Sequence, residues 1–122
     1  MNTYKSSSVV ARVRQSPPLD VTIPYDASWV HGKVILITGG ASGFGAGFVR
    51  QWAKHGATVI VGDINVEKGD ALCREINKEV NGKKAHFVHC NVTDWKSQVN
   101  LFKEAVKQSP HGGLDCTSTT NI

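Results

Sequence analysis

Thr38-Gly39-Gly40-Ala41-Ser42-Gly43-Phe44-Gly45 is the part of this 122-residue sequence that says most about its architecture. It follows the apolar run Val34-Ile35-Leu36-Ile37 and precedes a helical pattern that continues to His55. A buried strand, a glycine-rich turn and a helix start, in this order, are typical of a site that binds the phosphates of a dinucleotide. Glycine permits the tight turn at Gly39, and the missing side chains at Gly43 and Gly45 permit close approach and helix–strand packing.

Strands and helices alternate on both sides of this turn. Residues 34–38, 58–62 and 85–90 have the apolar, β-branched character of strands, and helical patterns cover residues 65–80 and 95–108. Thr93 or Asp94 can cap the last helix, and Ser109-Pro110 ends it. Short links between such elements predict parallel strands with right-handed crossovers. The predicted fold is α/β, the N-terminal half of a Rossmann doubly wound parallel sheet that is incomplete after the third helix.

The spacing of apolar residues predicts the buried face of each helix. The expected core positions are Phe48, Val49 and Trp52 in the first helix, Leu72, Ile76 and Val80 in the second, and Trp95, Val99, Phe102 and Val106 in the third.

Asp63 follows the second predicted strand, about 20 residues beyond the glycine turn. An acid at this place can accept hydrogen bonds from both ribose hydroxyls of adenosine, and it would repel the additional 2′-phosphate of NADP. No Lys or Arg lies within residues 39–45 or directly after Asp63. The sequence therefore favours NAD over NADP, whereas a solvated aspartate that caps the following helix is the structural alternative.

These residues resemble the short-chain dehydrogenase/reductase family. Thr38-Gly39-x-x-x-Gly43-x-Gly45 matches the family's cofactor signature, and Asp63 matches its NAD-selecting acid. Cys90-Asn91-Val92-Thr93-Asp94 is similar to the segment after the third strand, whose first acid holds the adenine amino group. Asn91 replaces that acid and can still accept a hydrogen bond, without charge assistance. Gly112-Gly113-Leu114-Asp115 resembles the lead into a fourth strand.

The resemblance implies a set of cofactor-binding residues: Thr38, Gly39, Ser42, Gly43, Phe44, Gly45, Asp63, Ile64, Asn91 and Val92. It also implies NAD-dependent oxidation of an alcohol or reduction of a ketone. A narrower likeness, through Tyr25-Asp26 and the turn itself, points to fungal NAD-dependent secondary-alcohol dehydrogenases.

The family's catalytic residues are a Ser and a Tyr-x-x-x-Lys pair, and this sequence contains no such pair. Ser8 stands four residues after Tyr4, and Trp29 stands four residues after Tyr25. No catalytic residue is therefore expected in this chain. An alcohol or ketone substrate is expected only for a longer form.

The resemblance stops after Asp115, where Cys116-Thr117-Ser118-Thr119-Thr120-Asn121-Ile122 replaces an apolar strand and an N-N-A-G-like turn. We divide the chain into an N-terminal extension (1–32), an NAD(P)-binding Rossmann segment (33–115) and a non-matching tail (116–122). The expected strand order is three-two-one-four. Without a fourth strand the apolar first strand becomes an exposed edge, which predicts a poorly soluble or partly molten chain.

Three hypotheses follow. The first is a truncated dehydrogenase that is inactive by itself, and the second is a short protein that binds NAD or a partner without catalysis. The third is part of a methyltransferase domain, which also uses a glycine-rich loop and a ribose-binding acid. The spacing of the glycines fits the pyrophosphate of a dinucleotide better than it fits the cofactor loop of a methyltransferase, which disfavours the third hypothesis.

Composition excludes several other classes. The hydrophobic fraction of 40% and the charged fraction of 20% are those of a globular protein. The net charge of +4 is modest and no basic stripe with interleaved aromatics occurs, so nucleic acid is not an expected partner. Three separated cysteines without a C-x-x-C motif predict reduced thiols. His86 and His89 would face opposite sides of a strand, so no metal site is expected.

The absence of long apolar runs and the composition of the N-terminal region predict where in the cell the protein is found. No apolar run reaches the length of a membrane helix or of a signal-peptide core, so no membrane association is expected. Residues 1–15 contain Lys5, Arg12, Arg14 and no acid, which weakly resembles a mitochondrial transit peptide until Pro17-Pro18 interrupts it. A cytoplasmic location is expected, with mitochondria as the alternative. Within the extension, Val21-Thr22-Ile23 and Trp29-Val30 can pack onto the domain, and dimerisation through the family's later helices is not expected.

Overall fold

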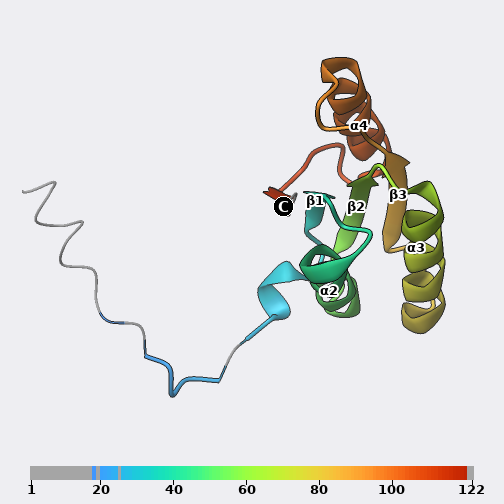
Figure 1. The fold of residues 1–122 in the computed structure, drawn as a ribbon. Coiled ribbons are helices and arrows are strands. Elements are labelled where there is room, and N and C mark those ends of the chain that lie inside the picture. Colours follow the sequence, from blue (N-terminus) through green and yellow to red (C-terminus); the bar gives the residue numbers. More distant parts are fainter. Residues whose placement is uncertain (1–17, 19, 25, 121–122) are drawn as a thin grey trace, which may run out of the picture.

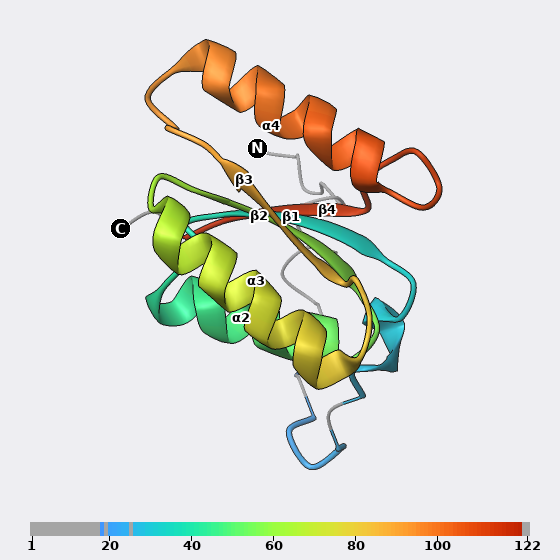
Figure 2. The same cartoon turned by 90° about the vertical axis from the view of Figure 1, so that its right-hand side faces the viewer.

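A computed structural model describes residues 18, 20–24 and 26–120, and four strands within them form one parallel sheet. The strand order is β3-β2-β1-β4 (Figures 1 and 2). The strands are β1 (Val34–Thr38), β2 (Thr58–Asp63), β3 (Ala85–His89) and β4 (Cys116–Thr119). The predicted α/β class and the predicted order of strands are both confirmed.

Helices cover the two faces of this sheet unequally. Helices α2 (Gly43–Lys54) and α3 (Val66–Val80) lie on one face, and α4 (Trp95–Gln108) lies on the other (Figure 2). A short 3-10 helix, η1 (Ser28–Val30), precedes β1. The result is the three-layer arrangement of a doubly wound sheet.

The central strands are apolar throughout because both of their faces are covered. Alternate residues of β1 and β2 enter different cores. Ile35 and Val59 pack in the cluster that contains residues of α2 and α3, whereas Leu36 and Ile60 pack in the cluster that contains Leu101 of α4. The continuous apolar sequence of each central strand therefore supplies residues to both hydrophobic cores, one on each face of the sheet.

Local signals in the sequence place the helix ends. Asn65 caps α3 by accepting a hydrogen bond from the backbone N–H of Lys68 at 3.0 Å, and Asn81 ends the helix in the left-handed conformation at φ 53°. Asp94 caps α4 by accepting from the N–H of Lys96 at 3.2 Å. Gly56, at φ 93°, follows α2 and lets the chain turn into β2. These boundaries agree with the sequence expectations to within about two residues.

The predicted buried face of α4 is wrong. Trp95 is 74% exposed, and Phe102 and Val106 are each 45% exposed, whereas Leu101 and Ala105 are fully buried. Leu101 and Ala105 thus form the side of the helix that is turned to the sheet, whereas Val99 of the predicted stripe is half-buried. The apolar periodicity correctly predicts a helix, but most of the residues that it selects lie on the exposed side of that helix.

The predicted core face of α2 needs a smaller correction. Val49 is buried, as expected, whereas Phe48 is exposed and stacks on the half-buried Trp52 with ring centroids 5.5 Å apart. In α3, Leu72 and Ile76 are buried and Val80 packs against them, so that prediction is confirmed.

The expectation that β1 forms an exposed edge is also wrong. Residues 116–119 form β4, which pairs in parallel with β1, Leu36 lying opposite Thr117. Because β4 is itself the edge of the sheet, three of its four side chains are exposed and their polar groups meet solvent instead of a core. Threonine is also favoured in strands by its β-branched side chain.

The described part of the N-terminal extension contributes one core residue. Val30 is 1% exposed and belongs to the cluster of α2 and α3, whereas Val21, Ile23 and Trp29 are exposed. The transit-peptide comparison, Tyr4 and Tyr25 lie outside the described residues. Among the residues that the structure describes, no helix has the length and hydropathy that a membrane crossing requires.

Candidate functional site

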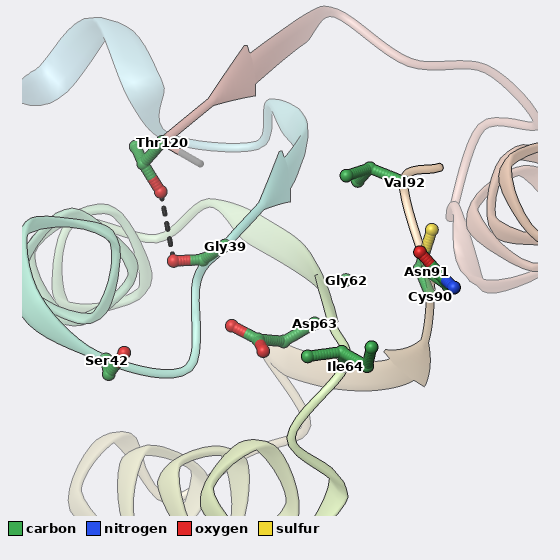
Figure 3. A pocket seen from close by; sticks show the side chains of 9 residues that line it. All are labelled: Gly39, Ser42, Gly62, Asp63, Ile64, Cys90, Asn91, Val92 and Thr120. Carbon is green, nitrogen blue, oxygen red and sulfur yellow. Dashed lines mark hydrogen bonds between the residues drawn. The ribbon is translucent and has the colours of Figure 1, made fainter. Parts of the chain in front are cut away.

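A cavity of about 380 Å³ lies at the carboxyl ends of the strands. All four strands contribute to it, because Gly39 follows β1, Asp63 ends β2, Cys90 follows β3 and Thr120 follows β4 (Figure 3). The carboxyl edge of a parallel sheet is where open α/β proteins bind ligands. The position of the cavity thus follows from the topology.

The glycine turn between β1 and α2 forms one wall of the cavity. Gly39 has φ 72° and Gly43 has φ 60°, conformations that favour glycine. The N–H of Gly39 donates to the carbonyl of Gly62 at 2.8 Å, which joins the turn to the end of β2. No atom outside the immediate chain neighbours lies within 4 Å of the place where a Cβ of Gly43 would stand. The turn is therefore open to a ligand at Gly43.

Gly45 is required by the protein's own packing. A Cβ there would collide with the carbonyl oxygen of Gly39 and lie 2.7 Å from Oγ1 of Thr120. The first turn of α2 therefore fits closely against β1 and β4.

The start of α2 presents backbone N–H groups without a side-chain cap. Ser42 occupies the N-cap position in extended conformation, and its side chain makes no capping hydrogen bond. The unpaired N–H groups and the helix dipole together favour an anion at this end. Ser42 lines the cavity, so an anionic group bound there would face these donors.

Asp63 points from the end of β2 toward the glycine turn (Figure 3). Its Oδ2 accepts from the N–H of Ala41 at 3.0 Å, and its Oδ1 accepts from the N–H of Asn65 at 3.0 Å. Each carboxylate oxygen has two lone pairs, so both can accept a further hydrogen bond. The carboxylate is thus held in place by two backbone donors while it lines the cavity.

The far side of the cavity consists of Ile64, Asn91 and Val92. Oδ1 of Asn91 accepts from the N–H of Thr93 at 3.0 Å and from its hydroxyl at 2.7 Å. The backbone N–H of Asn91 donates to Oγ of Ser97 at 2.9 Å. Asn91 therefore orders the loop after β3 with the same amide oxygen that we expected to face a ligand.

The structure brings most of the predicted site residues together. Gly39, Ser42, Asp63, Ile64, Asn91 and Val92 line the cavity, whereas Thr38, Gly43, Phe44 and Gly45 belong to the adjoining strand end and helix start. Sequence reasoning missed three lining residues, Gly62, Cys90 and Thr120. The first two flank predicted residues directly, so the strand ends could have indicated them. Thr120 comes from a segment that we had placed outside the sheet.

The lining suits binding better than proton transfer. In the part of the chain that the structure describes, the lining contains one carboxylate and no Lys, Arg, His or Tyr. Among the described residues, no group of three or more His, Cys, Asp or Glu is arranged to hold a metal ion. The thiol of Cys73 is buried elsewhere in the core, and burial raises its pKa to about 12, so it is a poor nucleophile.

Sequence comparison assigns the family. A model described as short chain dehydrogenase matches residues 33–118, which includes the glycine turn and most of β4. The chain belongs to the short-chain dehydrogenase family. The family match thus extends beyond Asp115, the residue after which the sequence pattern predicts that the resemblance stops.

Curated short-chain dehydrogenases include similar proteins from fungi and plants. A 5'-hydroxyaverantin dehydrogenase of Dothistroma septosporum is 39% identical over 95 residues, and one of Emericella nidulans is 41% identical over 103 residues. These matches cover 77% and 80% of this chain, and 30% of each relative. A short-chain dehydrogenase reductase 4 of Arabidopsis thaliana is 45% identical over 84 residues, covering 69% of this chain and 26% of that protein. The chain therefore spans about 30% of the length of these fungal relatives.

Solved structures of short-chain dehydrogenases share the fold. The 3-ketoacyl-(acyl-carrier-protein) reductase from Brucella melitensis, complexed with NADH, matches with a TM-score of 0.65 and 30% identity. That match covers 72% of this chain and 33% of the reductase. Hydroxysteroid dehydrogenase from Escherichia coli matches with a TM-score of 0.68 and 26% identity, covering 77% of this chain and 39% of the other.

Proposed function

We propose that this chain forms the cofactor-binding part of a dehydrogenase that uses NAD to oxidise an alcohol or to reduce a ketone. The observation that carries the proposal is the fixed carboxylate of Asp63, which lies in the cavity beside the glycine turn. Family membership and the NADH complex of the Brucella reductase support a nicotinamide dinucleotide as the ligand.

Residues in and beside the cavity would each contact a different part of the dinucleotide. Thr38, Gly39, Ser42, Gly43, Phe44 and Gly45 form the strand end, turn and helix start that would hold the pyrophosphate. Asp63 and Ile64 would hold the adenosine ribose, and Asn91 and Val92 would border the adenine. The positive-φ glycines, the open space at Gly43 and the uncapped start of α2 fit such a ligand.

Asp63 favours NAD over NADP on electrostatic grounds. A carboxylate beside the ribose accepts hydrogen bonds from hydroxyls, whereas it repels a 2′-phosphate. Within the described part of the chain, the lining contains no Lys or Arg to offset this repulsion. Since Ala41 and Asn65 hold both carboxylate oxygens, the side chain cannot turn away without losing two hydrogen bonds.

The chemical step requires residues that the printed sequence does not contain. The bound dinucleotide supplies hydride transfer, and this chain's residues bind and orient its adenosine and pyrophosphate portion. No Tyr-x-x-x-Lys pair occurs in the 122 residues. A proton transfer to or from an alcohol would therefore require residues outside these 122.

Binding measurements on Asp63 variants test the proposal. By calorimetry we expect NAD to bind at least about tenfold more tightly than NADP, a difference of about 1.4 kcal/mol. Asp63→Ala should reduce the ratio of the two affinities to about one, and Asp63→Asn should do so while keeping one acceptor oxygen for a backbone donor. Asp70→Ala, on the exposed face of α3, is the matched control. Equal affinities of the unmutated chain for NAD and NADP would show that Asp63 does not select between the two cofactors.

A non-catalytic NAD-binding protein of this length is the second candidate. It is favoured by β4, which covers β1 and gives the sheet a polar edge. The intact mass of the native protein separates the two candidates. A mass well above that of 122 residues supports the dehydrogenase, and a mass equal to it supports the short binding protein.

A further inference from the structure

The side chain of Thr120 connects the end of β4 to the glycine turn. Its Oγ1 lies 2.9 Å from the carbonyl oxygen of Thr38 and 2.9 Å from that of Gly39, and its single hydroxyl proton is shared between the two acceptors (Figure 3 shows the bond to Gly39). Its backbone N–H also donates to the carbonyl of Thr38, at 3.0 Å. One residue thus contacts the two consecutive carbonyls at which β1 becomes the turn.

We propose that Thr120 is a positioning residue for the cofactor, whose hydroxyl sets the orientation of the glycine turn. This inference rests on the proposed function, because the turn is the part that would hold the pyrophosphate. It extends that function to a residue that none of the sequence motifs contains.

The other attachments of the turn show why this contact matters. The N–H of Gly39 is bonded to Gly62, and the N–H of Ala41 is bonded to Asp63, so β2 holds the turn from one side. Thr120 holds it from the opposite side, through the carbonyls of Thr38 and Gly39. When the carbonyl of Gly39 is fixed, the plane of the following peptide is fixed with it. The orientation of the turn's backbone therefore depends on both neighbouring strands.

The packing around Gly45 couples Thr120 to α2 as well. A Cβ of Gly45 would stand 2.7 Å from Oγ1 of Thr120. The hydroxyl therefore lies against the first turn of α2, whose N–H groups would face the pyrophosphate. A shift of this hydroxyl would disturb both the turn and the helix start.

Two substitutions separate the hydroxyl from the bulk of the side chain. Thr120→Val keeps the shape and removes the donor, whereas Thr120→Ser keeps the donor and removes a methyl group. Thr117→Val, at an exposed position in the preceding strand β4, is the matched control. NAD is the probe, and its dissociation constant is measured by calorimetry on the full 122-residue chain.

We expect Thr120→Val to weaken NAD binding about tenfold, because a turn with a lost hydrogen bond must be ordered by the ligand. We expect Thr120→Ser and Thr117→Val to remain within about threefold of the unmutated chain. Equal affinity of Thr120→Val and the unmutated chain overturns the proposal. So does a loss of binding in Thr120→Ser as large as that in Thr120→Val.

Amide hydrogen exchange without ligand supplies a second readout. In Thr120→Val the N–H groups of Gly39 and Ala41 should exchange faster, whereas that of Ile37 in the core of β1 should not change. Faster exchange throughout the sheet would mean a general loss of stability and would overturn the positioning role. If the unmutated chain does not bind NAD, the proposed function fails, and hydrogen exchange still decides whether Thr120 orders the turn.

Discussion

Gly43 and Gly45 lie two residues apart in one turn, yet the structure requires glycine at them for different reasons. Gly43 has φ 60° and open space around it, so its backbone conformation disfavours most other residues and its surroundings do not. Gly45 lacks a positive φ, but the carbonyl of Gly39 and the hydroxyl of Thr120 occupy the place of a Cβ. Within one glycine motif, Gly43 therefore provides a backbone conformation with positive φ, and Gly45 provides the space for close packing.

This difference predicts that Gly45→Ala lowers the free energy of unfolding by roughly 1–3 kcal/mol, because backbone rather than a flexible side chain blocks the new methyl group. Gly47→Ala is the control in the same helix, since nothing lies within 4 Å of its Cβ position. It should raise the free energy of unfolding by up to about 1 kcal/mol, because alanine has the higher helix propensity. Urea denaturation measures both, and a neutral Gly45→Ala would contradict the packing described here.

At the scale of the element, α4 shows the limit of a periodicity argument. Trp95, Val99, Phe102 and Val106 form an apolar stripe, but the side chain of Leu101 enters the sheet instead. Gly62 of β2 explains the choice, because a Cβ there would stand 2.8 Å from Cδ2 of Leu101. The missing side chain of Gly62 leaves space on the strand, and the side chain of Leu101 occupies this space. The sequence of α4 alone does not show that β2 offers such a space.

The two faces of α4 can be distinguished by matched truncations. Leu101→Ala should cost about 2–5 kcal/mol of unfolding free energy, since it leaves a cavity in a fully buried site. Phe102→Ala should cost under about 1 kcal/mol, although it removes a larger side chain, because Phe102 is half exposed. Chemical denaturation of both variants measures the difference, and equal costs would mean that the face is assigned wrongly.

At the scale of the whole molecule, β4 changes what can be expected of the isolated chain. A partly molten chain is expected if β1 is an exposed edge, but β4 pairs with β1 and covers that edge. Side chains attach β4 to β1 at both ends. Oδ2 of Asp115 accepts from the N–H of Val34 at 2.8 Å, and Thr120 bonds to Thr38 at the other end. Solubility itself stays a prediction, to be measured by a thermal melt with a dye that binds apolar surface.

The Asp115 contact predicts a pH dependence of stability. The N–H of Val34, and then His111 at 3.0 Å and the charge of Lys33, hold the pKa of Asp115 below its ordinary value of 3.8. A depressed pKa means that the stabilisation is complete above the unfolded pKa and is lost as pH falls through the folded one.

Thermal melts between about pH 6 and about pH 3 check this dependence. The unmutated chain should lose more of its melting temperature on acidification than Asp115→Asn, which has no carboxylate to protonate. Asp70→Asn, on the surface of α3, should behave like the unmutated chain. An acid response of Asp115→Asn identical to that of the unmutated chain would exclude a contribution of this carboxylate.

Much of the fold and the site could be predicted from short stretches of sequence. The glycine turn, the cap at Asp94 and the apolar runs of β1 and β2 express local conformational demands, and each appeared where expected. Parallel topology then brought Asp63 and Asn91 to one edge of the sheet, since successive strands end on the same side. Those predictions needed no knowledge of distant contacts.

The sequence by itself thus determined the succession of strands and helices from β1 to α4, the position of the turn and the family to which the chain belongs. Only the tertiary structure decided which face of α4 is buried, that the Thr- and Ser-rich segment joins the sheet, and that Thr120 reaches Gly39. These features depend on residues such as Thr38 and Thr120, which are 82 positions apart. A polar strand can be stable at an edge that solvent reaches, and no local pattern states where the edge of a sheet will be.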